Sequence, residues 1–488
     1  MYSALNALVL ALPLTVSAET VVGVYMYHRH GDRTPKALKP ANLTDLGYQQ
    51  VHQSGEYYRS RYVDSSADVK INGLSSNIVK QSQIDVSAPS DDVLQNSAMG
   101  FLQGLYPPVG STSATETLRN GTTITAPLNG YQLIPVGSTS TGASSEDSAW
   151  LQSTSDCGNS EVSSNNYFAS SGYTSLLSST EDFYQNLMPV VNGTFDSDYV
   201  TFKNAYVVWD LINVAEIHNS SINSSDLLTN ETLFQLRTLA DKHEWGLAYN
   251  ESDDLRAMAG MQLAGQIVSY LNSTITGKGA SKFGIQFGAY ATFMSFFGLA
   301  QLPAANSDFR AVVDYASSMV FELFTPSDDV SSSNFPRSDD LYVRFLFHNG
   351  TATNASEPVE YPLFGRSNTT ISWSDFQSEM TKFAVSTTEQ WCTKCGNTTG
   401  TCAAYADSSS SGSSGASSKS GSGSGSGIST AVGGVIGAMV TLAVVLGLEA
   451  LIMLVAGLRL VRKPSAKGVA GGAGAAGAAS EGAEKSAA

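Results

Sequence analysis

The chain has 488 residues, of which 42% are hydrophobic and 14% are charged, so it can bury a large core and is not a disordered polymer. Its formal net charge of -16 at pH 7 keeps it soluble and argues against a nucleic-acid-binding surface, which needs clustered lysines and arginines. An anionic ligand would therefore need a local basic pocket.

The N-terminus has the composition of a secretory signal peptide. An apolar run over residues 4–16 closes in Val16-Ser17-Ala18 before Glu19, and small residues at such positions suit signal peptidase. We expect residues 1–18 to be removed. The alternative, an uncleaved anchor, is disfavoured because the run is shorter than the roughly 20 residues that cross a bilayer.

Sequons for N-glycosylation are dense, which predicts a glycosylated surface in a secreted chain. The acceptors are Asn42, Asn120, Asn192, Asn219, Asn223, Asn230, Asn250, Asn272, Asn349, Asn354, Asn368 and Asn397.

The chain has four cysteines, and this even number in an oxidising compartment favours disulfides. They are Cys157, Cys392, Cys395 and Cys402. The Cys-x-x-Cys pair at 392–395 could also form half of a redox or zinc site, but no matching Cys/His pair follows it. We therefore expect neither a metal nor a cofactor. We expect the long-range bridge to join Cys157 to Cys392 or to Cys395.

The C-terminal part reads as a tether, a membrane span and a tail. Residues 406–430 are rich in serine and glycine, which is typical of a flexible linker. Residues 431–458 are apolar enough to cross a membrane as one helix, and four basic residues follow within 459–467. The positive-inside rule then places the N-terminal domain outside and the tail, 459–488, in the cytoplasm. A GPI signal is the alternative, but about 30 residues follow the apolar run here.

The region between the signal peptide and the linker predicts an α/β fold. Residues 21–27 form an apolar run of strand length, directly followed by a loop that contains glycine and proline. Residues 342–347 also read as a strand, whereas 208–247 and 255–272 have helical spacing. We expect an α/β core over 19–150 and 255–405, with an inserted helical cap over 151–254.

The loop after the first strand carries the candidate chemistry, in the sequence HRHGDRTP at 28–35. Arg29 and Arg33 flank His30 on a turn that contains a glycine. Guanidinium groups can hold a phosphoryl group while the imidazole attacks phosphorus, and glycine lets the backbone approach the oxygens. The pattern predicts phosphohistidine chemistry on a phosphorylated small molecule.

Residues 29–35 resemble the RHGxRxP signature of the histidine acid phosphatases. Further segments appear in the family's order: Leu43-Thr44 with Gly47 and Gln50, the helix SAMGFLQGLYPP at 97–108, and then YPLFG at 361–365 and WC at 391–392. The resemblance covers most of 21–397, with the segment near 160–250 matched loosely. It implies a phosphoglycerate-mutase-like core sheet flanked by helices.

The resemblance also assigns roles: His30 as the nucleophile, and Arg29 and Arg33 as the residues that hold phosphate. His28 would lie beside the site. Asp32 would orient a guanidinium or, equally well, face solvent.

The chain departs from the family at two places. The family has an arginine that completes the phosphate clamp and another arginine shortly after it, and the register from Ser97-Ala98 gives Ser87 and Val93 at these two places. The family also has a His-Asp pair whose aspartate protonates the leaving oxygen. Depending on the register, Gln286-Phe287 or Ala289-Tyr290 occupies that place. His218 or the pair His243-Glu244 in the insertion could replace the missing groups.

Three functions remain open from the sequence. The first is an outward-facing phosphomonoesterase that works through His30. The second is a phosphatase-like membrane glycoprotein that binds a phosphorylated ligand without efficient turnover. The third, phosphoglycerate-mutase-type transfer, is disfavoured because a sugar-phosphate mutase has no evident use for a signal peptide.

Overall fold

The computed structural model describes residues 19–67, 69–138, 156–218 and 221–411. The predicted signal peptide, the membrane span at 431–458 and the tail lie outside these residues. Within the described ranges, no helix is long and apolar enough to span a membrane.

A mixed sheet of eight strands forms the centre, in the order β10-β8-β7-β1-β6-β2-β5, with β9 paired to β8. β1 runs parallel to β6 and antiparallel to β7. The strands are β1 (Thr20–Arg29), β2 (Ile84–Ala88), β5 (Gly137–Ser138), β6 (Phe283–Gly288), β7 (Ser318–Thr325), β8 (Tyr342–His348), β9 (Val359–Tyr361) and β10 (Thr370–Ser372). The strands predicted at 21–27 and 342–347 are confirmed. Because β1 is buried along almost its whole length, it can be apolar on both faces.

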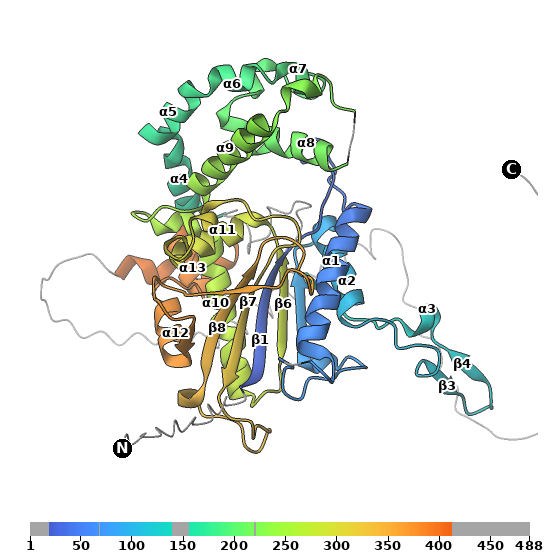
Figure 1. Ribbon diagram of the computed structural model, residues 1–488. Coiled ribbons are helices and arrows are strands. Elements are labelled where there is room, and N and C mark those ends of the chain that lie inside the picture. Colours follow the sequence, from blue (N-terminus) through green and yellow to red (C-terminus); the bar gives the residue numbers. More distant parts are fainter. Residues whose placement is uncertain (1–18, 68, 139–155, 219–220, 412–488) are drawn as a thin grey trace, which may run out of the picture. The chain divides into compact units, whose positions relative to one another are not determined.

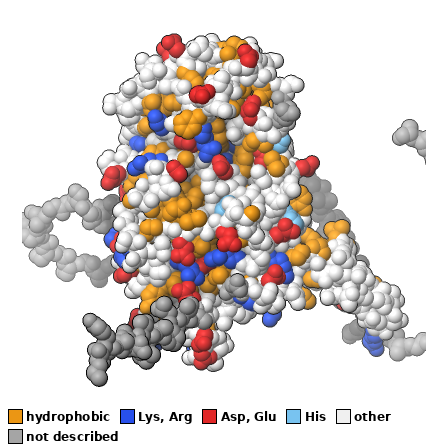
Figure 2. All heavy atoms as spheres, in the orientation of Figure 1, with side chains coloured by type: hydrophobic (Ala, Val, Ile, Leu, Met, Phe, Trp, Pro, Cys, Tyr) orange, Lys and Arg blue, Asp and Glu red, His pale blue; other side chains and the backbone are white. Residues whose placement is uncertain are grey.

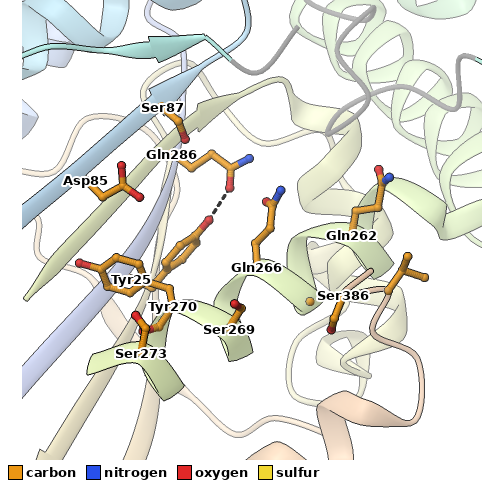
Figure 3. Close-up of a pocket in the computed structure, with 12 residues that line it drawn as sticks. Tyr25, Asp85, Ser87, Gln262, Gln266, Ser269, Tyr270, Ser273, Gln286 and Ser386 are labelled. Carbon is orange, nitrogen blue, oxygen red and sulfur yellow. Dashed lines mark hydrogen bonds between the residues drawn. The ribbon is translucent and has the colours of Figure 1, made fainter. Parts of the chain in front are cut away.

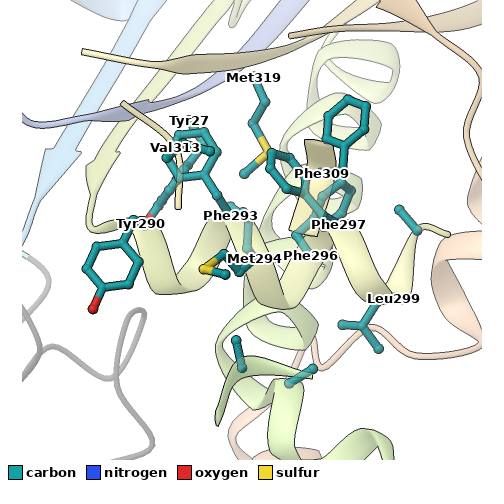
Figure 4. Packing of buried hydrophobic residues seen from close by; sticks show 14 of the residues in the cluster. Tyr27, Tyr290, Phe293, Met294, Phe296, Phe297, Leu299, Phe309, Val313 and Met319 are labelled. Atoms are coloured by element: carbon teal, nitrogen blue, oxygen red, sulfur yellow. The ribbon is translucent and has the colours of Figure 1, made fainter. Parts of the chain in front are cut away.

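Helices cover both faces of this sheet (Figure 1). α1 (Asp45–Tyr58) and α2 (Asp92–Leu105) share a hydrophobic cluster with Val24 and Met26 of β1. On the opposite face, Tyr25 and Tyr27 belong to a second cluster with α10 (Met258–Thr276), α11 (Tyr290–Leu299) and α12 (Trp373–Thr381). Figure 4 shows the phenylalanines of α11 in this cluster. The two-residue period of β1 therefore divides its side chains between two cores.

Six helices that follow β5 in the described chain and precede α10 form what we call the α4–α9 segment. Figure 1 shows them beyond the edge of the sheet at which β1 and β6 end. They are α4 (Gly158–Asn165), α5 (Ser171–Ser179), α6 (Glu181–Gln185), α7 (Met188–Val191), α8 (Ala205–Ile217) and α9 (Asn230–Ala248). Other short elements are α3 (Pro127–Gly130), the hairpin of β3 (Thr115–Thr117) and β4 (Thr123–Thr125), and α13 (Thr388–Cys395).

Two disulfides involve α13. Cys157 bonds to Cys395, which joins the start of α4 to the end of α13, and Cys392 bonds to Cys402. The predicted long-range bridge from Cys157 is confirmed, with Cys395 as its partner.

Candidate active site

The signature loop begins where β1 ends, so the sheet itself positions His30. The register of the parallel pair sets Arg29 opposite Gly288, the last residue of β6. On the other side, the Arg29 backbone N–H donates to the Ser317 carbonyl (2.7 Å) and the Ala316 N–H donates to the His30 carbonyl (2.9 Å). The candidate nucleophile is therefore held by strands on both sides of β1.

A close backbone contact fixes the next turn of this loop. A Cβ on Gly31 would lie 2.2 Å from the Gly47 carbonyl oxygen, and a Cβ on Gly47 would lie 2.0 Å from the Asp32 carbonyl oxygen. No side chain fits at either position. The two glycines let the signature loop lie directly on the first turn of α1.

Side chains of α1 and α2 then hold the loop backbone. Gln50 Oε1 accepts from the Asp32 N–H (2.8 Å), and Ser97 Oγ accepts from the Gly31 N–H (3.2 Å). Thr44 caps α1 by accepting from the Gly47 N–H (3.0 Å). The segments that resemble the family in sequence are thus the ones that support the signature loop.

His30 is fully buried, and its hydrogen bond defines the tautomer of the ring. Nδ1 lies 2.8 Å from the Gly31 carbonyl oxygen, which can only accept, so Nδ1 carries the proton. In the neutral ring, Nε2 then holds the lone pair that a nucleophile needs. The Tyr315 ring lies beside the imidazole, with 5.6 Å between centroids.

The Arg29 guanidinium lies between two tyrosine rings at the carboxyl end of β1. Its central carbon is 4.5 Å from the Tyr315 centroid and 5.3 Å from the Tyr290 centroid. It also donates to the Val313 carbonyl, which fixes its orientation.

Arg33 is paired with a carboxylate of the α4–α9 segment. Its Nη1 lies 3.1 Å from Asp210 of α8, and its Nη2 donates to the Tyr206 hydroxyl (3.3 Å). Asp210 also accepts from the Lys36 backbone N–H (2.8 Å) and is fully buried. Because Arg29, His30 and Arg33 are only 0–2% exposed, a phosphoryl group can enter only if Asp210 and its surroundings give way.

His28 and Asp32 do not share this cluster. His28 packs between Phe101 and Phe287, and burial lowers its pKa to about 4. Asp32 is fully buried, so the expectation that it faces solvent is wrong. Its Oδ2 accepts from Thr44 Oγ1 (2.5 Å) and lies 2.6 Å from His218 Nε2 at the end of α8. Its carboxylate thus ties α8 and the start of α1 to the loop.

The positions where the chain departs from the family hold no arginine, imidazole or carboxylate. Ser87 lies within β2, and Val93 is a buried residue in the first turn of α2. Gln286 lies inside β6, whereas Ala289 and Tyr290 directly follow this strand and begin α11. Tyr290, at the start of α11, is thus the one of these residues whose ring lies beside the Arg29 guanidinium.

Tyr290 connects the surroundings of Arg29 to Glu244 and His243, the pair that the sequence suggested as a replacement for the missing catalytic groups. Its hydroxyl donates to Glu244 Oε2 (2.7 Å), and Glu244 Oε1 lies 2.7 Å from His243 Nδ1. His243 is 5% exposed and lies among aromatic rings, with Phe202 at 5.5 Å. Glu244 therefore reaches the site through Tyr290, whereas His218 contacts Asp32, which lies outside the cluster of His30 and the two arginines.

Sequence reasoning missed Asp210, Tyr206 and Tyr315. Tyr206 and Asp210 lie four residues apart and so on one face of α8, but nothing in their local sequence shows that this face meets the loop. Tyr315 precedes β7, where only the antiparallel pairing with β1 brings it beside His30.

The visible surface has no broad basic area. On the face in Figure 2, basic and acidic side chains are interspersed. The cationic groups that could bind an anion lie instead in and next to the signature loop. They are Arg29, Arg33 and Lys36, whose Nζ lies 5.6 Å from the centroid of the Tyr290 ring.

Comparisons with solved structures agree with this fold. The phytase of Citrobacter braakii matches with a TM-score of 0.50 at 12% identity, covering 77% of this chain and 99% of that one. The phytase of Klebsiella sp. ASR1 matches with a TM-score of 0.51 at 11% identity, covering 75% and 96%. At such low identity these likenesses show the fold alone.

Comparisons of sequence identify the family. Prostatic acid phosphatase of Bos taurus is 23% identical over 343 residues, which cover 67% of this chain and 80% of the relative. The sequence model of the histidine phosphatase superfamily (branch 2) matches residues 37–348, directly after the signature loop. The chain therefore belongs to the histidine phosphatase superfamily, branch 2.

Proposed function

We propose that this protein hydrolyses phosphomonoesters through a phosphohistidine at His30, with Arg29 and Arg33 holding the phosphoryl group. The observation that carries the proposal is the Nδ1–H bond from His30 to the Gly31 carbonyl, which leaves a lone pair on Nε2 of a residue that Arg29 and Arg33 flank in one loop. Family membership supports the same reaction class.

The reaction takes two displacements at phosphorus. His30 Nε2 attacks phosphorus, the P–O ester bond breaks, and the electron pair leaves with the alcohol oxygen, which takes up a proton. Water then attacks the phosphohistidine, the P–N bond breaks, and inorganic phosphate leaves. The guanidinium groups stabilise the charge on the equatorial oxygens in both steps.

Glu244 and Tyr290 are our candidates for the proton that the leaving oxygen needs. Tyr290 lies beside Arg29, and its hydroxyl already shares a short hydrogen bond with the Glu244 carboxyl group. In this relay the hydrogen bond reverses its direction: a protonated Glu244 donates to the Tyr290 oxygen, while the Tyr290 hydroxyl turns to the alcohol oxygen and gives it its proton. The base that remains can accept a proton from water in the second step.

The first experiment assays the full chain on p-nitrophenyl phosphate and inositol hexakisphosphate across acid pH. We expect turnover that disappears in His30→Ala, because no other nucleophile replaces Nε2. Turnover that survives in His30→Ala would overturn the assignment of the nucleophile.

A second experiment tests the proton pathway with Tyr290→Phe and Glu244→Gln. A positioned acid accelerates such reactions by about 10²–10⁴-fold, so we expect losses of this order on glycerol 2-phosphate, whose alkoxide must be protonated. p-Nitrophenolate leaves without protonation, so its rate should change far less. Equal losses on both substrates would show that these residues only support the structure.

A second candidate function is binding of a phosphorylated ligand without turnover. The burial of His30 and the ion pair between Arg33 and Asp210 favour it, because both oppose entry of a substrate. In this case neither enzyme assay gives turnover, and equilibrium binding of phosphate esters still depends on Arg29 and Arg33.

We also propose that the described domain lies outside the cell or in a lumen, anchored by residues 431–458. Two disulfides support an oxidising compartment. Of the predicted acceptors, only Asn219 lies outside the described residues, and the others are exposed or half-buried. Endoglycosidase treatment of the chain from lysed cells should lower its apparent mass. No shift, together with digestion of the described domain by protease added to the cytoplasmic face of sealed membrane vesicles, would contradict this topology.

A further inference from the structure

A polar cavity of about 430 Å³ lies between the sheet and α10, and the His30 cluster shares none of its residues. Tyr25, Ser87 and Gln286 line it from the sheet, and Gln266, Ser269 and Tyr270 line it from α10 (Figure 3). Its volume is within the range of small-molecule sites.

The helix side of this cavity is polar where packing alone would favour apolar residues. Gln262, Gln266, Ser269 and Ser273 recur at a spacing that puts them on one face of α10. The sheet side matches it, since Ser87 pairs with Gln286 on the neighbouring strand. Two polar walls therefore face each other across the cavity.

Several polar atoms at this cavity have no partner within the described part of the chain. Gln286 is 2% exposed, and its Oε1 accepts from the Tyr25 hydroxyl, which leaves Nε2 as a donor without an acceptor (Figure 3). Gln266 Oε1 and the Tyr270 hydroxyl likewise have no partner. Because buried polar atoms in native proteins are almost always hydrogen-bonded, these atoms point to a missing polar occupant.

The charges at the cavity define the class of this occupant. Asp85 is the one charged side chain among the described residues that line it, so nothing there would hold a phosphate. The Tyr25 and Tyr270 rings lie 5.4 Å apart and add apolar surface. Amides, hydroxyls and aromatic rings together suit a ring that carries several hydroxyl groups. We propose that this cavity binds an uncharged sugar.

The sugar can come from two sources. One is a free saccharide, and the other is a glycan of this chain. Asn272 is an exposed residue of α10 in a predicted sequon and directly precedes Ser273 at the cavity. Enzymatic removal of glycans separates the two sources. If a glycan of this chain fills the cavity, its removal makes the cavity accessible to added sugar, whereas a site for free saccharide is accessible before the treatment.

The test is saturation-transfer NMR with mannose and N-acetylglucosamine on the full chain, before and after deglycosylation. We expect saturable binding in the millimolar range. A site for free saccharide binds the sugar before deglycosylation, whereas a cavity filled by a glycan of this chain binds it only afterwards. No saturable binding in either preparation would overturn the proposal.

Variants locate the binding. Gln266→Leu on the α10 side and Tyr25→Phe on the sheet side should each weaken sugar binding at least tenfold and leave phosphatase activity unchanged. Gln377→Leu, an exposed position of α12, is the matched control for added apolar surface. His30→Ala should retain sugar binding. Binding that both cavity variants leave intact, or that His30→Ala abolishes, would contradict this location.

Discussion

The ion pair between Arg33 and Asp210 sets how easily an anion enters the site. A phosphate on Arg33 must displace a buried carboxylate that already lies 3.1 Å from the guanidinium. Asp210→Asn removes this competing charge but keeps an oxygen that can accept from the Lys36 N–H. We expect inorganic phosphate to bind at least tenfold more tightly, which is about 1.4 kcal/mol. If the protein turns over substrate, inhibition by inorganic phosphate measures this affinity. If it does not, equilibrium dialysis with phosphate measures it.

A control separates competition from loss of structure. Asp210→Asn leaves a buried guanidinium without its counter-ion, so the ligand-free variant should melt at a lower temperature than the wild type. Added phosphate should then raise the melting temperature of the variant more than that of the wild type. Weaker phosphate binding in the variant would mean instead that Asp210 holds Arg33 in its binding position.

His28 makes the folded state sensitive to acid. Burial lowers its pKa from 6.5 to about 4, with smaller opposing and reinforcing contributions from its neighbours. Between these values the unfolded chain binds a proton that the folded chain does not. Stability contributed by the neutral ring is therefore complete above about pH 6.5 and falls as the pH drops to 4, by about 3 kcal/mol.

Urea unfolding at pH 7 and pH 4.5 tests this contribution with His28→Phe. The phenylalanine keeps the ring contacts with Phe101 and Phe287 but cannot take up a proton. We expect the variant to lose less stability than the wild type between the two pH values. Equal losses would show that another group controls the acid response.

At the level of elements, the signature loop and α1 meet through their backbones at two glycines, Gly31 and Gly47. Gly31→Ala would drive a methyl group into the Gly47 carbonyl, and backbone cannot move aside as a flexible side chain can. We expect a loss of about 1–3 kcal/mol in the free energy of unfolding and a reduced kcat, because the loop must lift away from α1.

Gly172→Ala in α5 is the matched control for this change. Its new Cβ would have nothing within 4 Å, so it should be neutral or stabilise by up to about 1 kcal/mol. Chemical denaturation of both variants gives the comparison. A Gly31→Ala variant as stable and as active as the control would contradict the tight contact.

Local patterns explain which elements could be predicted. The strand at 21–27 carries its signal within a few residues, as an apolar run. The partner of Arg33 carries none, because Asp210 is 177 positions away and reaches the loop only through the packing of α8. Likewise, the sequence left two registers near the end of β6, and the strand pairing shows only that Gln286 and Phe287 lie within this strand.

At the scale of the whole molecule, a disulfide joins the start of the α4–α9 segment to α13, near the C-terminal end of the described residues. Cys157 precedes α4 and Cys395 ends α13, so this bond closes a loop with a separation of 238 residues, against 10 for Cys392 and Cys402. A cross-link restricts the unfolded chain more when its loop is longer. The two bonds should therefore contribute unequally to stability, although α13 carries a cysteine of each.

Two double variants measure this inequality. Loop-closure entropy gives about 5.5 kcal/mol for the long loop and about 2.7 kcal/mol for the short one. Cys157→Ala/Cys395→Ala should therefore lower the free energy of unfolding by about 3 kcal/mol more than Cys392→Ala/Cys402→Ala, measured by denaturant unfolding without reductant. If the short loop proves the costlier to open, the bond between Cys392 and Cys402 acts on the folded state, by holding the end of α13 against the residues that follow it.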